Sequence, residues 1–245
     1  MLNAGAGAGV SITAFTVDSV GRMVAVPAST RLLGPSSSLP AQIEFSPDGS
    51  RIVVSERQTN LIKVLAVGAD GTVGAPRQTT SVGNSPFGFA FDRNFGRLFV
   101  SEANNGLANL SSASSYSVAA DGTLQTVTGA AATLQSDACW LVLSQDGRFA
   151  YTSNTGSGSI TAYSVSTAGA LTRLNANGRA ADTGAGSVPI DMAVSDDGKF
   201  LFVLAVGVPA IQTYAINADG SLSSASSIGA VPRSAVGLVA RSTVP

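Results

Sequence analysis

Few side chains in this protein could do acid–base chemistry, because its 245 residues include no histidine and only one cysteine. Histidine is the commonest general base and the commonest metal ligand, so a carboxylate would have to serve instead. Glu56 and Glu102 each follow a serine at the end of an apolar run, and either could act as a catalytic base at a central site. Alternatively, each is a solvated loop carboxylate, with Glu56 paired to Arg57. Glu102 is the better catalytic candidate because the loop that follows it, through Asn109, is longer.

Three further side chains stand at matching places in successive apolar runs and could bind a ligand. Gln42, Trp140 and Asp191 share one register, and Gly88 and Gly237 hold the same place in two other runs. If these positions face one channel, an amide, an indole and a carboxylate surround a cavity whose remaining wall is glycine. A few polar groups in such a cavity are typical of a small-molecule site. The alternative is structural: Trp140 packs between repeats, and Asp191 accepts hydrogen bonds from backbone amides.

The remaining reactive groups indicate neither a metal site nor a cofactor. Cys139 has no basic neighbour in sequence that would lower its thiol pKa, so we expect a small buried core residue. Asp196 and Asp197 belong to a turn and not to a dense run of oxygen ligands of the kind that binds calcium. The alternating glycines of residues 4–9 are similar to a nucleotide-binding loop, but no helix follows them to supply a dipole.

The sequence repeats with a period of about 50 residues, which is visible in its turn glycines. One set comprises Gly49, Gly96, Gly147 and Gly198, and a second set comprises Gly21, Gly71, Gly122, Gly169 and Gly220. Most of these glycines follow an aspartate. Asp-Gly favours a tight hairpin turn, because glycine adopts a positive φ without steric cost. We therefore expect a turn of positive φ at each position.

Short β-branched and apolar runs flank these turns, and no segment has a sustained helical period. Four antiparallel strands in about 50 residues match one blade of a β-propeller. We predict an all-β fold with one propeller domain over residues 1–245, and blade repeats at 39–84, 85–135, 136–187 and 188–234. A fifth, closing blade would combine residues 1–38 and 235–245, with 235–240 as its innermost strand, 1–5 as the tail of its second strand and Ile12–Val17 as its third.

Several motifs carry a family resemblance that covers essentially the whole chain: Phe45-Ser-Pro-Asp-Gly49, Phe87-Gly-Phe-Ala-Phe-Asp92, Tyr151-Thr-Ser-Asn154 and Ala181-Asp-Thr-Gly-Ala-Gly186. They resemble the lactonase-like propellers, which include bacterial 6-phosphogluconolactonase and the fungal carboxymuconate-lactonizing enzyme. That family usually has seven blades, so the five repeats here resemble its last five. Its enzymes carry Pro-Arg-His and then, after a strand, Asn-Glu. The matching segments here are Pro40-Ala-Gln with Glu56 and Pro86-Phe-Gly with Glu102, so the glutamate is kept while arginine and histidine are replaced.

The resemblance implies a hydrolase or cyclase acting on a lactone or sugar acid, and a secreted or periplasmic location. The missing arginine and histidine argue against that reaction in its usual form, and the alternative is a non-catalytic extracellular propeller that binds a small molecule, glycan or protein. Charged residues make up only 12% of the chain and the net charge is −1, so nucleic acid is not an expected partner. No apolar run approaches the roughly 18–20 residues that span a bilayer, and the first residues do not resemble a signal peptide. The oligomeric state stays open.

Overall fold

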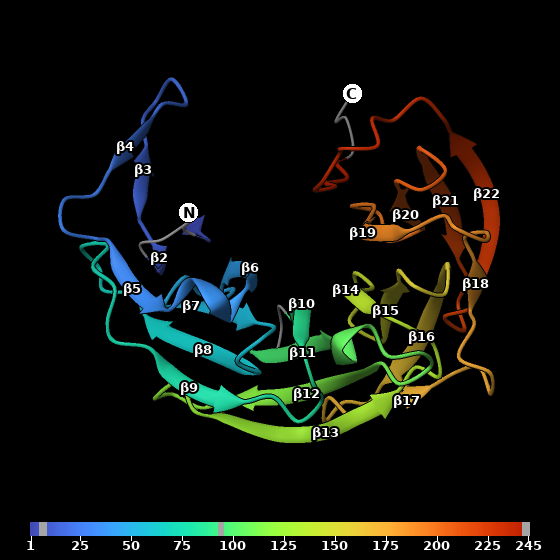
Figure 1. Ribbon diagram of the computed structural model, residues 1–245, viewed down its shortest axis with the longest axis horizontal. Coiled ribbons are helices and arrows are strands. Elements are labelled where there is room, and N and C mark those ends of the chain that lie inside the picture. Colours follow the sequence, from blue (N-terminus) through green and yellow to red (C-terminus); the bar gives the residue numbers. More distant parts are fainter. Residues whose placement is uncertain (5–8, 93–95, 242–245) are drawn as a thin grey trace.

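The computed structural model describes residues 1–4, 9–92 and 96–241, and its antiparallel sheets follow one another along an arc (Figure 1). Strands account for 50% of the residues and helical turns for 3%. The two helical turns are short 3-10 segments, η1 (Ser36–Ser38) and η2 (Asn104–Gly106). The prediction of an all-β propeller with four-stranded antiparallel blades is thereby confirmed.

Four blades are complete, and in each the first four strands are paired in chain order, with the first strand nearest the centre of the arc (Figure 1). Blade 2 contains β6 (Pro40–Phe45), β7 (Arg51–Glu56), β8 (Leu61–Ala66) and β9 (Arg77–Thr80). Blade 3 contains β10 (Pro86–Asp92), β11 (Arg97–Glu102), β12 (Ser112–Val118) and β13 (Leu124–Ala132). Blade 4 contains β14 (Ala138–Leu143), β15 (Phe149–Asn154), β16 (Ser159–Val165), β17 (Leu171–Arg173) and β18 (Ala181–Asp182), the last paired to β16. Blade 5 contains β19 (Pro189–Val194), β20 (Phe200–Ala205), β21 (Ala210–Ile216) and β22 (Leu222–Ile228).

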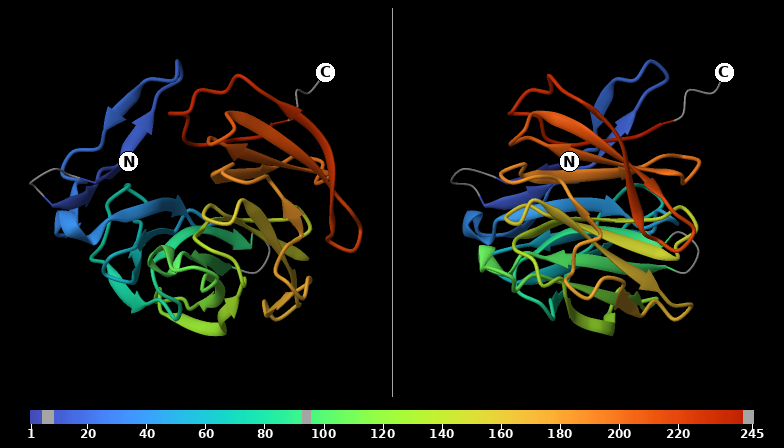
Figure 2. Two further views of the ribbon diagram at one scale, coloured as in Figure 1. Left: turned by 45° about the vertical axis from the view of Figure 1, so that its right-hand side comes forward. Right: turned by 90° about the vertical axis from the view of Figure 1, so that its right-hand side faces the viewer.

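Blade 1, at the N-terminal end of the arc, differs from the others. It is a three-stranded sheet in the order β1 (Leu2–Asn3), β2 (Val10–Ile12), β5 (Arg31–Gly34). The predicted strand Ile12–Val17 is divided: β2 ends at Ile12, and β3 (Phe15–Val17) pairs with β4 (Met23–Ala25) in a separate hairpin. In both views of Figure 2 this hairpin extends away from the rest of the sheet. Of the predicted second-strand tail at residues 1–5, Leu2 and Asn3 form β1, and Gly5 lies outside the described residues.

The prediction that residues 235–240 form the innermost strand of a closing blade is wrong, because residues 229–241 contain no strand. Within the described residues β1 pairs only with β2, so this segment does not complete blade 1. The segment instead follows blade 5: the backbone N–H of Leu238 donates to Asp191, and Arg233 Nη1 donates to the carbonyl of Gly207 at 2.7 Å.

All nine predicted turn glycines have positive φ, between 63° at Gly96 and 87° at Gly122 and Gly169. Three of the turns share the pattern Ser-X-Asp-Gly. In the turn before β15, for example, the Ser144 hydroxyl donates to Asp146 at 2.7 Å and accepts the Phe149 N–H at 3.0 Å. These local hydrogen bonds fix the hairpin, and so fix the register of each innermost strand against the next.

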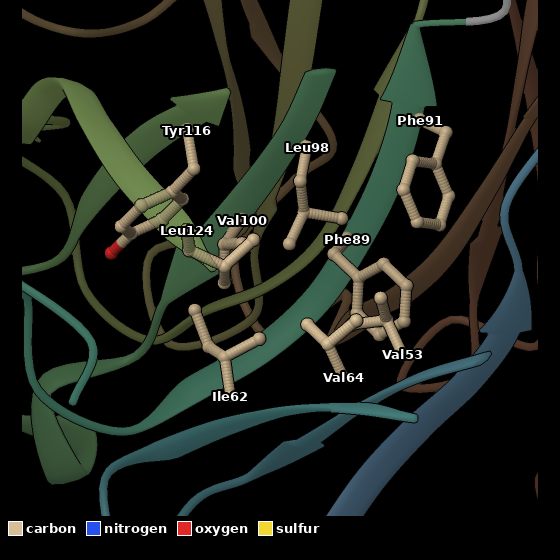
Figure 3. Packing of buried hydrophobic residues seen from close by; sticks show 9 residues of the cluster. All are labelled: Val53, Ile62, Val64, Phe89, Phe91, Leu98, Val100, Tyr116 and Leu124. Atoms are coloured by element: carbon tan, nitrogen blue, oxygen red, sulfur yellow. The ribbon is translucent and has the colours of Figure 1, made fainter. Parts of the chain in front are cut away.

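The hydrophobic core is divided into four clusters, and each fills the space between two consecutive blades. The cluster between blades 2 and 3 is shown in Figure 3, where Val53 and Val64 of blade 2 lie against Phe89 of blade 3. Because strand side chains alternate between faces, Val54 points the other way and packs against blade 1. The blades therefore stack face to face along the arc.

Tyrosine hydroxyls add polar links between the blades. Tyr163 on β16 donates to the carbonyl of Ala131 at 3.0 Å, and Tyr214 on β21 donates to that of Asp182 at 2.9 Å. Each bond joins the third strand of a blade to the outer strand of the blade before it. This satisfies a phenol that is otherwise buried in the core.

Candidate functional site

The predicted register of the innermost strands is supported by two side-chain contacts of the same form. The amide of Gln42 on β6 forms two hydrogen bonds with the backbone of Phe89 on β10, donating at 2.9 Å and accepting at 2.7 Å. Asp191 on β19 accepts from the N–H of Leu238 at 2.6 Å. Gly88 and Gly237 are predicted to share the register of Gln42 and Asp191, and Phe89 and Leu238 are the residues that follow these glycines. Each of the two side chains therefore contacts the residue directly after the matching glycine. The hypothesis that Asp191 binds backbone amides is confirmed.

A cavity of about 320 Å³ lies among the innermost strands β6, β10 and β14, with β19 beside them. Its polar lining side chains are Gln42, Glu44, Asp92, Ser144 and Gln145, and its apolar lining includes Trp140, Phe89, Phe91, Val142 and Val194. None of these lining residues, within the described part of the chain, is a lysine or an arginine. The wall of the cavity thus combines carboxylate, amide and hydroxyl groups with apolar side chains.

Trp140 is the largest side chain of this cavity and the only tryptophan of the chain. Its residue packs against Gly88 so closely that a Cβ added to that glycine would lie 2.8 Å from Trp140 Cα and 3.0 Å from its Cδ2. The indole is half-buried and contacts the core between blades 4 and 5. Trp140 therefore packs between blades, as the structural hypothesis held, and it also lines the cavity, while its role in ligand binding stays a prediction. Within the described residues the indole N–H donates no hydrogen bond.

Glu44 is a cavity residue that the sequence analysis missed. It is exposed, and one carboxylate oxygen accepts a hydrogen bond of 3.1 Å from Gln42 Nε2. The signal was strand alternation, which puts residues 42 and 44 on the same face of β6. The other cavity carboxylate, Asp92, is buried and lies 3.7 Å from Arg97 Nη1.

Asp191 does not line the cavity, although it shares the register of Gln42 and Trp140. Its side chain is buried, and its two oxygens accept hydrogen bonds from the backbone N–H groups of Met192 and Leu238. Burial raises the pKa of the Asp191 carboxyl to about 6, and the two backbone donors oppose this shift in part. Asp191 therefore anchors the C-terminal segment beside the channel.

Glu56 and Glu102 are fully buried, so the hypothesis of solvated loop carboxylates is wrong. Glu56 pairs with Lys63 at 2.8 Å, not with Arg57, and also accepts from the hydroxyl of Thr59. Lys63 is itself buried and donates to the carbonyl of Leu33 in blade 1.

Glu102 holds the loop between blades 2 and 3 in place. It accepts hydrogen bonds from the hydroxyls of Ser81 and Ser112 and from the backbone N–H of Gly83. Asn154 takes the equivalent place at the end of β15, where its amide donates to Ser159 and Thr161. These contacts favour a structural role at all three positions. The catalytic role of Glu56 and Glu102 stays a prediction, and neither residue lines the cavity.

The thiol of Cys139 is buried next to the cavity residue Trp140, as the sequence analysis expected. Burial raises its pKa to about 12, which leaves it protonated and unreactive at neutral pH. Among residues 1–4, 9–92 and 96–241 no group of three acidic or thiol side chains is arranged to hold a metal ion. In the same part of the chain, no helix is long and apolar enough to cross a membrane.

The blades and their inner channel define a β-propeller, and the comparison with known families agrees. A family model described as lactonase, 7-bladed beta-propeller, matches residues 10–114 and 111–236. The chain therefore belongs to this lactonase propeller family. No curated protein sequence matches it.

Solved structures similar to this chain are propellers at low sequence identity. A Lactobacillus plantarum protein has a TM-score of 0.75 and 19% identity over 91% of this chain and 66% of its own. A candidate 6-phosphogluconolactonase from Bacteroides fragilis has a TM-score of 0.70 and 20% identity over 91% and 65%. The periplasmic gluconolactonase of Pseudomonas aeruginosa has a TM-score of 0.72 and 17% identity over 96% and 68%. The chain thus spans about two thirds of the length of the structures that it matches, and at these identities the likeness extends to the fold alone.

Proposed function

We propose that this protein binds an uncharged lactone of sugar size in the cavity among β6, β10 and β14, and opens its ring by hydrolysis. The observation that carries the proposal is the lining of the cavity, which combines the indole of Trp140 with carboxylate and amide groups and contains no basic side chain among the described residues. Membership of the lactonase family supports the reaction class.

The indole suits a sugar-like ring in two ways. Its apolar surface packs against the C–H face of the ring, and its N–H, which no described protein group accepts, can donate to a ligand oxygen. A phosphorylated lactone suits the cavity poorly, because a phosphate dianion needs arginine, lysine or a helix N-terminus. Glu44 and Asp92 would instead repel it.

Glu44 is the carboxylate of the cavity best suited to act as a general base. It would take a proton from a water molecule as the water oxygen attacks the lactone carbonyl. The ring C–O bond then breaks, and the departing alkoxide takes up a proton to give the open hydroxy acid. Without imidazole or metal, we expect a rate gain of about 10²–10⁴-fold.

The experiment uses the single tryptophan as its reporter. Quenching of Trp140 fluorescence by D-glucono-δ-lactone measures binding, and acid release measures hydrolysis, with 6-phosphogluconolactone as the charged comparison. We expect Trp140→Phe to weaken binding, and Glu44→Gln to slow hydrolysis while binding persists. Asp182→Asn, an exposed carboxylate on β18, is the control.

Three outcomes separate the alternatives. Binding without hydrolysis would favour a non-catalytic propeller. Hydrolysis that Glu102→Gln abolishes and Glu44→Gln does not would assign the base to Glu102. Fast turnover of the phosphorylated lactone would contradict the proposed preference for an uncharged ligand.

A further inference from the structure

We propose that the channel has a second subsite, which binds a carboxylate anion through Arg57 at the end where the innermost strands begin. This end is marked by the first residues of β6, β10, β14 and β19, which are Pro40, Pro86, Ala138 and Pro189. Neither Arg57 nor its neighbour Phe87 lines the cavity described above. The subsite is therefore independent of the proposed lactone site.

The guanidinium of Arg57 is held in place by an aromatic ring. Its central carbon lies 4.8 Å from the centre of the Phe87 ring, on the innermost strand of the next blade. The backbone of Arg57 is fixed as well, since its N–H donates to the carbonyl of Leu39 at 3.1 Å. Stacking of this kind leaves the in-plane N–H groups of the guanidinium directed sideways, where they can meet a ligand.

The charge of Arg57 has no protein counter-ion in the described part of the chain: no carboxylate oxygen comes within 4 Å of its guanidinium nitrogens. The adjacent Glu56 is already bound to Lys63 and Thr59. Arginine at a half-buried position normally pairs with an anion, because a desolvated unpaired charge is costly. An anionic ligand would supply that partner.

Two orphaned polar atoms lie in the segments that build this end of the channel. Arg57 Nε is buried without a hydrogen-bond partner, and so is the hydroxyl oxygen of the fully buried Ser38. The two segments are joined by backbone bonds, one of them from Gln58 N–H to the Ser38 carbonyl at 3.1 Å. Buried polar atoms are nearly always satisfied in native proteins, so unpaired donors indicate a missing partner.

Arg57 is also unusual among the equivalent positions of the other blades. The residue after the second strand is Ala103 in blade 3, Thr155 in blade 4 and Val206 in blade 5. The cation therefore does not belong to the repeat pattern that builds the blades.

One guanidinium selects a singly charged, planar anion. A carboxylate matches its two parallel N–H donors, forming a bidentate pair. The chemical class of the ligand is accordingly a small monocarboxylate.

The test compares sodium D-gluconate with D-sorbitol, a polyol of the same length without the carboxylate. Binding is followed by titration calorimetry and by the arginine Nε–H resonances in a ¹H–¹⁵N spectrum. We expect gluconate to bind and shift one Nε–H resonance, and Arg57→Gln to remove that resonance and weaken binding at least about tenfold. Arg57→Lys keeps the positive charge but lacks the two parallel N–H donors of the guanidinium, so it should weaken binding about threefold.

Arg148→Gln is the matched control. Its guanidinium also lies over a phenylalanine, 5.2 Å from the centre of the Phe149 ring, but it is already paired with Asp146 at 2.6 Å. That variant should bind gluconate like the parent. Melting temperatures establish that the Arg57 variants are folded, and Arg57→Lys serves if Arg57→Gln is not. The proposal is overturned if the parent does not bind gluconate, if sorbitol binds equally well, or if every folded Arg57 variant retains the parent's affinity.

Discussion

The carboxylate of Asp191 and the backbone of Leu238 are joined by a hydrogen bond of 2.6 Å, which ties the C-terminal segment to the innermost strand of blade 5. The same contact recurs between Gln42 and Phe89, where an amide replaces the carboxylate. The difference in chemistry matters, because only the carboxylate titrates. The stability of the C-terminal end of the arc therefore depends on pH in a way that the Gln42 contact does not.

We predict that Asp191 makes the protein less stable as pH rises from about 4 to about 6. Burial raises its folded-state pKa from 3.8 to about 6, so the folded state holds the proton more tightly than the unfolded chain. The stabilising contribution is complete below pH 3.8 and is lost as pH rises through about 6. The loss is on the order of 2–3 kcal/mol in the free energy of unfolding. Urea denaturation at pH 4.5 and 7.0 measures it, and Asp191→Asn should abolish this part of the difference.

The exposed Asp219 provides the control for that measurement. The hydroxyl and backbone N–H of Ser221 lower its pKa, so its contribution is lost only as pH falls below its ordinary value of 3.8. Asp219→Asn should leave the difference between pH 4.5 and 7.0 unchanged. An Asp191→Asn protein with the full parental difference would contradict the assignment.

We predict that Gly147→Val destabilises the protein by about 1–3 kcal/mol through backbone strain. Gly147 has a φ of +69°, and an added Cβ would meet nothing closer than Asp92 Oδ1 at 3.8 Å. Space is therefore not limiting, and the cost comes from a β-branched residue at positive φ. Gly229→Ala is the comparison, because no heavy atom lies within 4 Å of the added Cβ and its φ is not in the left-handed region. Thermal denaturation should separate the two variants, and equal melting temperatures would contradict the prediction.

Gly88→Ala tests the close approach of β10 and β14. The added Cβ would lie 2.8 Å from both the Cys139 carbonyl oxygen and Trp140 Cα, so the two strands must separate. We expect a loss of about 1–3 kcal/mol in the free energy of unfolding, with a shift in Trp140 fluorescence emission in the folded state. Unchanged emission and stability together would mean that the strands separate freely.

Replacing the buried glutamates should affect stability before chemistry. Glu56→Gln leaves Lys63 buried without a counter-charge, which costs about 3–5 kcal/mol. Glu102→Gln presents an amide N–H₂ to donors that need an acceptor, which costs about 1–3 kcal/mol. Urea denaturation measures both losses, and lactone hydrolysis by the folded fraction should persist. A stable Glu102→Gln protein without hydrolysis would support the catalytic role predicted from sequence.

The sequence was most informative where structure is set locally. A positive φ at a turn glycine depends on a few adjacent residues, so the positions of all nine turns could be predicted from the repeat. The equivalent positions of Gln42 and Asp191 in their innermost strands could be predicted from the same turns. In contrast, strand formation at 235–240 requires a partner strand, and an apolar stretch alone cannot show whether one is present.

The surroundings of the carboxylates depend on contacts between blades and were harder to predict. Lys63 pairs with Glu56 within blade 2, and it reaches the Leu33 carbonyl only because blades 1 and 2 stack. A signal existed, since Lys63 interrupts the apolar run of β8, where an unpaired cation could not be buried. Glu44 could likewise have been found by counting two residues from Gln42. Arg57 gave no such signal, because its stacking on Phe87 joins residues of different blades.

The four core clusters join only neighbouring blades, so the chain resembles a linear array whose two end units each have one contact face fewer than the units between them. In such an array the free energy needed to expose an amide to solvent is lowest at the ends and rises toward the middle. Amide hydrogen exchange should thus be fastest in β1–β5 and in β19–β22 and slowest in β10–β16. Local unfolding of the blades at either end would then precede unfolding of the central blades, which hold most of the cavity wall.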